Sequence, residues 1–436
     1  MALGGGVFVT QNKKLPGSYI NFVSADKTSV VIGERGVCAI PMILDWGKSG
    51  EVITVTAETL RNNSLDVFAH AYTDAAMMPL REVFKTAQKL YIYRLNEGTK
   101  ASCTYAEALY GGSRGNDFKI IIEANADDAT KFDVHTLLDN KIVDTQTVKT
   151  ATELKANKYV TFKSDATIAE TANTPLTGGA NGTVDGEAWQ KALDVLEGYS
   201  FNVLGIVSTD DKIKDLAVFY TKRLRDEVGI KFQTVLYKSA SDDKGIINVV
   251  NKLKNETVSE ETANLVYWVT GAQAGCAVNK SCTNKVYDGE LDVDTKYTQV
   301  QLEEAIDNGQ FIMHKVGDDV RVLTDINSKV SVTEEEGEDF KSNQTIRVLD
   351  QIGNDIASLF NSKYLGVIPN DTAGRVSLWS DIVAHHKDLQ SIRAIENFSS
   401  EDVTVEEGES KKKVVVNDHV TPTNAMEQLY MTVVVA

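Results

Sequence analysis

The hydrophobic positions of the first hundred residues alternate between the patterns of buried strands and helices. Residues 35–44 (RGVCAIPMIL) form a nearly continuous apolar run, which is typical of a strand buried on both faces. Residues 80–88 have helical spacing, and KLYIYRL at 89–95 again predicts a strand. Helices that alternate with buried strands pack in layers, so we expect an α/β core.

Between residues 98 and 182 the pattern changes to strands bounded by turns. Glycine-rich loops lie near both ends of this segment, GGSRGN at 111–116 and LTGGANG at 176–182. Such loops let an inserted domain leave and rejoin a core, which predicts a β-rich outer domain at 98–182. Its expected strands are 118–123, 132–137, 141–148 and 159–162.

The α/β pattern resumes after the insertion. Asp185 is a candidate cap for a helix that precedes a strand at 201–207, and Asp210 or Asp211 can cap a second helix that ends at Gly229. A strand at 230–237 follows. Alternation of this kind indicates a parallel or mixed sheet. Further expected elements are a closely packed, small-residue helix at 260–278, a helix at 299–307, and a strand pair at 311–315 and 319–323.

Two helices and a hairpin are expected in the last hundred residues. Residues 345–360 are strongly amphipathic, and 375–390 also have helical periodicity. Residues 403–406 and 412–416 flank a turn with acidic residues before it and lysines after it, which predicts a hairpin. The apolar stripe of the amphipathic helix consists of Ile346, Leu349, Ile352, Ile356, Leu359 and Phe360.

Both extremities of the chain have strand-like, uncharged sequences. An uncovered strand of this kind is an aggregation site, so it needs a partner. The partner can be a sheet of the same chain or a sheet of a neighbouring copy. The N-terminal of these two segments follows a flexible glycine hinge at 4–6. Two strand-like ends of this kind favour a subunit that is joined to its neighbours by strand exchange. The residues are Val7, Phe8 and Val9 at one end and Leu429, Tyr430, Met431, Thr432, Val433, Val434 and Val435 at the other.

These patterns together define the expected fold class. It is an α/β (α+β) multidomain protein, with a mixed-sheet α/β core, an inserted β-rich domain and a C-terminal α+β domain. Extended strand arms are expected at the N- and C-terminal ends.

Charge and composition narrow the set of partners. The 45 Lys and Arg against 62 Asp and Glu give a net charge of −17, which argues against nucleic acid as a partner. No signal-like or membrane-spanning apolar run is present, so we expect a soluble protein made in the cytoplasm, without direct membrane insertion. The four cysteines are too few and scattered for a disulfide framework, which favours free thiols.

The chain has no recognisable catalytic or cofactor motif. Gly47-Lys48-Ser49 resembles the end of a phosphate loop, but Met42 occupies the position of the required first glycine. Gly-x-Ser-x-Gly is absent, and His385 and His386 are helix neighbours that point about 100° apart, which makes them poor co-ligands. Three nearby aspartates at 288, 292 and 294 lack calcium-loop spacing. We therefore expect no enzyme activity, no cofactor and no metal.

Several segments, in order, match a known family. The sequence resembles the tail sheath protein of contractile-tailed phages and phage-tail-like bacteriocins, closest to that of PBSX-type particles and diffocin-like bacteriocins of Gram-positive bacteria. The segments are LPGSYINF from Leu15, RGVCAIPMILDWG from Arg35, YRLNEGTKA from Tyr93, LTGGANGT from Leu176, VTGAQAGCAVNKSCTNKVYDG from Val269, VRVLTDIN from Val320, IRVLDQIGNDI from Ile346 and AMEQLYMTVVV from Ala425.

This resemblance implies a structural subunit of a contractile sheath. Stacked hexamers would surround an inner tube and contract to drive it through a cell envelope, and the two arms would pair with neighbouring subunits. The implied partners are other copies, the inner tail tube, and the baseplate and tail terminator proteins. The implied location is a phage tail or tail-like particle, assembled in the bacterial cytoplasm and released on lysis. The alternative is a non-contractile structural tube or surface-layer subunit.

The resemblance also implies that different segments of the chain have different roles. An inner C-terminal domain would contact the tube, and the polar side of the 345–360 helix is the candidate contact, with an ordinary surface helix as the alternative. The candidate residues are Arg347, Asp350, Gln351, Asn354 and Asp355. The expected segments are an N-terminal arm (1–23), a core domain in two parts (24–97 and 183–310), the insertion (98–182), the inner domain (311–426) and a C-terminal arm (427–436).

Overall fold

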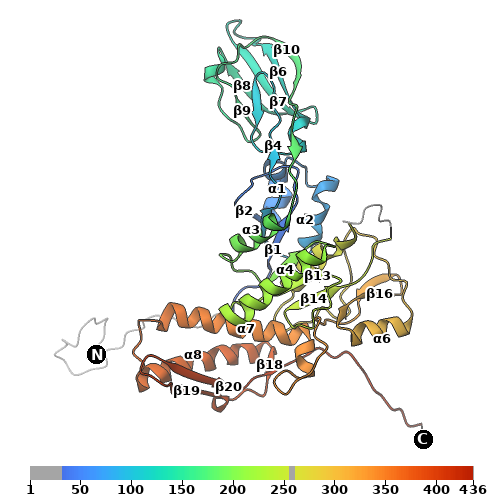
Figure 1. The fold of residues 1–436 in the computed structure, drawn as a ribbon, viewed down its shortest axis with the longest axis vertical. Coiled ribbons are helices and arrows are strands. Elements are labelled where there is room, and N and C mark those ends of the chain that lie inside the picture. Colours follow the sequence, from blue (N-terminus) through green and yellow to red (C-terminus); the bar gives the residue numbers. More distant parts are fainter. Residues whose placement is uncertain (1–31, 255–260, 436) are drawn as a thin grey trace, which may run out of the picture.

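The structure is a computed structural model that describes residues 32–254 and 261–435 of the chain. The molecule is elongated, with an α/β body in the middle, a β-rich segment at the top and two long helices at the bottom (Figure 1). The predicted N-terminal arm strand, Val7, Phe8 and Val9, lies outside the described residues, as does Ala436.

A seven-stranded mixed sheet forms the centre of the body. Its strand order is β15-β14-β13-β12-β1-β3-β2, and only the β2–β3 pair is antiparallel. The apolar run at 35–44 becomes β1, which is buried from Cys38 to Met42 between β12 and β3. The strands are β1 (Val37–Met42), β2 (Val52–Thr56), β3 (Lys89–Arg94), β12 (Val203–Ile206), β13 (Gln233–Tyr237), β14 (Ile246–Val249) and β15 (Gln310–Phe311).

Helices cover both faces of this sheet and enclose two apolar cores. Trp189 and Tyr220 belong to the core on one face, under α3 and α4, and Trp268 of α5 belongs to the core on the other. A Cβ on Gly271 of α5 would collide with the carbonyl oxygen of Val83, so the small residue lets α5 pack directly on α2. The helices are α1 (Ala57–Phe68), α2 (Met78–Val83), α3 (Gly186–Leu196), α4 (Asp211–Lys222) and α5 (Leu265–Gly275).

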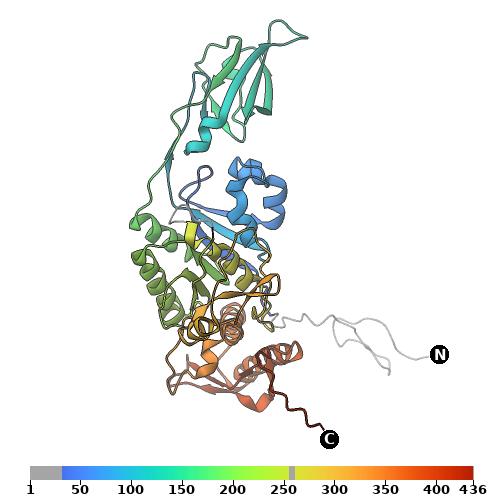
Figure 2. The ribbon, with the colours of Figure 1, turned by 90° about the vertical axis from the view of Figure 1, so that its right-hand side faces the viewer.

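A narrow neck of two short antiparallel strands connects the insertion to the body. Beyond the neck lies a four-stranded antiparallel sheet of order β10-β6-β7-β8 (Figure 2). Trp46 of the body packs against Phe118 at the base of the insertion, with ring centroids 5.0 Å apart. The elements are the neck strands β4 (Gly98–Thr99) and β11 (Ala180–Asn181), with β5 (Ala106–Ala108), β6 (Phe118–Ala124), β7 (Phe132–Leu138), β8 (Lys141–Val148), β9 (Val160–Phe162) and β10 (Thr171–Pro175).

Glycines allow the backbone segments of the neck to touch. Gly112 has a φ of 138°, which side chains rarely adopt, and a Cβ there would overlap the carbonyl oxygen of Asp45. A Cβ on Gly182 would collide with the carbonyl oxygen of Glu97 in the same way. The glycine-rich loops recognised in the sequence therefore serve close backbone contact.

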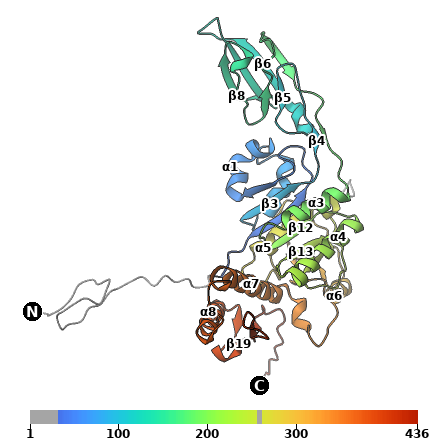
Figure 3. The same ribbon diagram turned by 60° about the vertical axis from the view of Figure 1, so that its left-hand side comes forward.

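Two long helices and a hairpin form the lower end of the molecule. Figure 3 shows α7 between the central body and α8. The apolar sides of both helices share a core with the hairpin, which includes Val348, Ile382 and Val403. The elements are α7 (Asn343–Leu359), α8 (Thr372–Ser391), the hairpin β19 (Val403–Glu407) and β20 (Val414–Asp418), and the small pair β18 (Ile395–Glu396) and β21 (Thr421–Pro422).

The lower domain starts later in the chain than the expected residue 311. Strand β15 ends at Phe311 and pairs with β14 of the central sheet. Met313 and Val322, in the hairpin that follows, are buried in the central core. This segment therefore belongs to the body, because its apolar side chains complete the body's core. Its elements are α6 (Gln299–Asp307), β16 (Met313–Val316) and β17 (Asp319–Val322).

We predict that Gly112→Ala destabilises the attachment of the outer domain. The added methyl group meets the carbonyl oxygen of Asp45 and the residue has a positive φ, which costs about 1–3 kcal/mol. Urea unfolding and limited proteolysis at the neck measure the effect. Gly186→Ala is the matched control, because a Cβ there has no neighbour within 4 Å. Equal stability of the two variants would contradict the interpretation of the neck.

Candidate assembly surfaces

The C-terminal arm follows β21 and leaves the body of the molecule. The Glu427 carboxylate accepts hydrogen bonds from Thr283 (2.6 Å) and Thr324 (2.8 Å), and the Ala425 amide donates to the side chain of Gln344 (3.0 Å). These contacts fix the base of the arm against the body. The remainder of the arm extends outward (Figures 1 and 2).

The apolar side chains of this arm lack cover within the described part of the chain. Leu429 is 86% exposed, Tyr430 88% and Val434 87%. Residues 424–435 form neither helix nor strand. Exposed apolar residues in a row mark an interaction surface. In the described chain Leu429 to Val435 pair with no sheet, and strand exchange with a neighbour stays a proposal.

The polar side of α7 faces the central body, which corrects the expected role of its residues. Arg347, Asp350, Gln351 and Asp355 are all less than 10% exposed, and Asn354 is half-buried. We expected these five side chains to face a tube. Four of them are buried inside the chain, and the half-buried Asn354 bonds to the backbone of Lys231 in the body, so this side of α7 is not a free surface for a tube.

Two ion pairs bind this polar side to the body. The Arg225 guanidinium donates two hydrogen bonds to the Asp350 carboxylate (2.7 and 2.8 Å). The Arg347 guanidinium donates to Asp325 (3.1 Å) and to the side chain of Gln273 on α5 (2.7 Å). Buried charges of this kind are stable only when each has its partner, so the interface is specific in register.

Asp325 is the centre of the second ion pair. Burial alone would raise its pKa, but the Arg347 charge and hydrogen bonds from the Cys282 amide and the side chains of Gln273 and Asn343 hold the pKa below its usual value. The carboxylate is therefore charged at neutral pH. It joins the body, through Gln273, to the start of α7, through Asn343.

A buried histidine pair connects α8 to its neighbours. The Nε2 atom of His385 lies 2.9 Å from the Asp355 carboxylate of α7, and Nε2 of His386 lies 2.8 Å from Asp418 of β20. The two Nδ1 atoms are 3.4 Å apart. As expected, the two side chains diverge: their Nε2 atoms face different carboxylates, those of Asp355 and Asp418. Their role is to connect the two helices and the hairpin.

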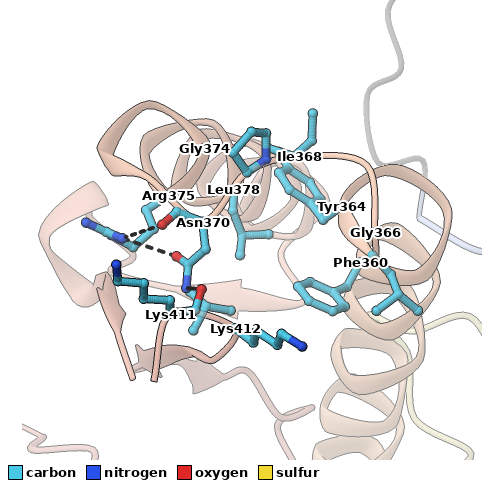
Figure 4. Close-up of a pocket in the computed structure, with 13 residues that line it drawn as sticks. Phe360, Tyr364, Gly366, Ile368, Asn370, Gly374, Arg375, Leu378, Lys411 and Lys412 are labelled. Carbon is cyan, nitrogen blue, oxygen red and sulfur yellow. Dashed lines mark hydrogen bonds between the residues drawn. The ribbon is translucent and has the colours of Figure 1, made fainter. Parts of the chain in front are cut away.

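The hairpin presents an open edge beside an apolar groove. Within the described chain β20 pairs only with β19, whereas β19 also packs on α8. A groove of about 370 Å³ opens next to the turn of the hairpin (Figure 4). Phe360, Tyr364, Ile368 and Leu378 line it, and Asn370 closes one side by donating to the Lys413 carbonyl oxygen (2.7 Å).

The motifs considered for chemistry have structural partners. Lys48 forms an exposed ion pair with Glu51, and the carbonyl oxygen of Gly47 accepts a hydrogen bond from Arg94 (2.7 Å). Asp288 accepts from the indole of Trp268. Within residues 32–254 and 261–435, no group of three or more potential metal ligands is gathered. Over the same residues, no helix has the length and apolarity to cross a membrane.

Comparison with known proteins identifies the family. Four domain families match consecutive parts of the chain: the Gp18 domain III N-terminal region of the tail sheath protein (35–95), the phage tail sheath β-sandwich domain (96–181), the central domain (182–328) and the C-terminal domain (335–436). The phage-like element PBSX protein XkdK of Bacillus subtilis is 34% identical over 99% of both chains.

Solved structures agree with this result. The sheath tail protein of Desulfitobacterium hafniense is 37% identical, covers 95% of this chain and 99% of its own, and superposes with a TM-score of 0.84. The helical sheath of the anti-feeding prophage, in its contracted state, shares the fold at 13% identity, with 97% and 99% coverage and a TM-score of 0.58. The chain belongs to the phage tail sheath family, and the predicted identity is confirmed.

We predict that Asp350→Asn strongly destabilises the junction of the two domains. The substitution leaves the buried Arg225 charge without a counter-ion, which costs about 3–5 kcal/mol in the free energy of unfolding. Urea denaturation of the full chain measures the loss. Glu51→Gln, which removes an exposed ion pair with Lys48, is the control and should cost less than about 1 kcal/mol. Losses of equal size would show that the α7 interface does not depend on this pair.

Proposed function

We propose that this chain polymerises as stacked hexamers around an inner tail tube and that the resulting sheath contracts to drive the tube through a cell envelope. Family membership over nearly the whole chain supports this function, and the uncovered C-terminal arm is the observation that carries it. A further support is the fold shared with a sheath solved in its contracted state.

The arm of one copy supplies a strand to the hairpin of another. Along an extended segment such as 429–435, successive side chains point to opposite sides, as in a strand. Strand β20 has an edge that no other strand of the described chain covers. Pairing would satisfy the backbone groups of both segments and cover Val415 and Val416, which are exposed on β20. The apolar groove next to the turn provides space for arm side chains at the end of this edge.

The work of contraction is stored in subunit contacts. The buried charges of α7 hold the central body and the lower domain together as one unit, while the arm beyond Glu427 is free to change direction. Rigid units can then rotate while their strand connections persist. A difference of a few kcal/mol per subunit suffices, because every copy in the lattice contributes.

The partners and the location of the protein are proposed from its membership of the family. The partners are the inner tube, the baseplate and the tail terminator, and assembly takes place in the bacterial cytoplasm before release on lysis. The subunit acts by polymerising and not by catalysis. Electron micrographs of the chain expressed with its tube protein test this, since a contractile sheath has two lattice pitches, before and after triggering. A single pitch under all conditions would contradict contraction.

We predict that deletion of residues 429–436 abolishes sheath assembly without unfolding the subunit. The truncation keeps Glu427 and its two threonine contacts, and the deleted side chains are exposed in the described chain. The melting temperature should change by less than about 2 °C, because little apolar surface is lost from the core. Sedimentation and electron microscopy measure assembly, and normal sheaths from the truncated protein would refute the role of the arm.

A matched variant tests the acceptor. Val415→Lys places a charge on the exposed side of β20 and should block the addition of a strand while leaving the monomer folded. A mixture of this variant with the truncated chain has one intact donor and one intact acceptor. It should form short oligomers that neither protein forms alone. Failure to form them would mean that the arm binds elsewhere.

A further inference from the structure

The cysteine pair at the end of α5 lies in the loop that joins three parts of the molecule. Cys276 follows the last residue of α5, and Cys282 comes six residues later. Val278, between them, is buried in the core of the lower domain. Asn279 donates to the carbonyl oxygen of Ile392 (2.7 Å), and Thr283, just after the loop, holds the base of the C-terminal arm.

Each thiol lies against the backbone next to the other cysteine. The Cys276 thiol donates to the carbonyl oxygen of Lys280 (3.4 Å), and the Cys282 thiol lies 3.6 Å from that of Ala272, one helical turn before Cys276. The Cys282 thiol thus lies beside the backbone at the end of α5, and the two cysteine side chains are close enough to affect each other's pKa. Cys276 is partly exposed between the exposed residues Gly275 and Ala277, whereas Cys282 is buried.

Two guanidinium groups hold the loop in place, that of Arg35, which is half-buried, and that of Arg347, which is buried. Arg35 donates to the carbonyl oxygen of Cys276 (3.0 Å), and Arg347 donates to that of Lys280 (2.7 Å). The amide of Cys282 donates to Asp325 (2.9 Å). The loop is therefore fixed at both ends, and it carries one partly exposed thiol, Cys276, and one buried thiol, Cys282.

We infer that Cys276 and Cys282 form an oxidisable dithiol site, which a hydroperoxide converts into an intramolecular disulfide. The Cys276 thiolate attacks one peroxide oxygen, forms a sulfenic acid and releases hydroxide. The Cys282 sulfur then attacks the Cys276 sulfur, its proton and the displaced hydroxide form water, and the S–S bond closes. Two thiols and one hydrogen peroxide thus give one disulfide and two waters.

The electrostatics suit this division of roles. The neighbouring Cys282 side chain lowers the pKa of Cys276 to about 7 against the effect of burial, and the charges of Arg347 and Arg35 lower it further. The same contact, together with burial, raises the pKa of Cys282. Cys276 is thus the attacking thiolate at neutral pH, and Cys282 is the resolving thiol.

The disulfide would close the loop covalently at the junction of the body, the lower domain and the arm. A consequence, which rests on the proposed function, is that sheaths stiffen at this junction when they leave the reducing cytoplasm. The chemistry itself is a property of the single subunit. Its test on the isolated chain therefore does not depend on whether the subunit forms a sheath.

The first experiment treats the purified full chain with hydrogen peroxide and counts its thiols. Alkylation after denaturation should find two reactive cysteines in place of four, and peptide mass spectrometry should find Cys276 joined to Cys282. Before oxidation, Cys276 should react with iodoacetamide at pH 7 about tenfold faster than free cysteine, whose pKa is about 8.5. Four remaining thiols, or a disulfide that includes Cys103, would overturn the inference.

Variants separate the two roles. Cys282→Ser should accumulate a sulfenic acid at Cys276 that dimedone traps, and Cys276→Ser should leave Cys282 unreacted because it is buried. Cys103→Ser is the matched control and should form the disulfide as the unmodified chain does. Equal dimedone labelling of Cys276 with and without Cys282 would show that Cys282 does not resolve it. If a variant fails to fold, the peptide map of the unmodified chain decides the question.

Discussion

The paired charges on α7 are the contacts on which the arrangement of the domains depends. Arg347 and Asp350 are buried between the body and the lower domain, and each meets a partner of opposite charge, Asp325 and Arg225. A partial opening of this interface would separate both ion pairs without fully hydrating the four charged groups, which is unfavourable. Breaking this interface therefore means separating both ion pairs at once, which favours a single rigid arrangement of the two domains.

The same helix shows where sequence reasoning ends. Its amphipathic period predicted a helix at 345–360, and α7 spans Asn343–Leu359. The period also separated its apolar from its polar side, but it contains no information on what the polar side meets. Asp350 binds Arg225, which lies 125 positions earlier. Contacts at that separation are set by the tertiary fold, so polar residues that looked exposed are buried.

For the other elements, the strength of the local sequence pattern determined whether the element could be predicted. The buried strand β1 and the helix cap at Asp185 were predicted, because continuous apolar runs and capping side chains are local features. Strand β14 and helix α1 were not recognised, and α1 has few apolar residues and a non-helical residue, Asn63, in its middle. The exposed arm was predicted from its composition, but its attachment through Glu427 depends on distant threonines.

The neck has a consequence for how such subunits diversify. Residues 98–182 are attached through β4 and β11, which form a single short antiparallel pair. Neighbouring strands lie about 4.8 Å apart, so any module whose ends are that close could replace the outer sheet without disturbing the central fold. The inserted module can then change in size and sequence while the central sheet keeps its fold.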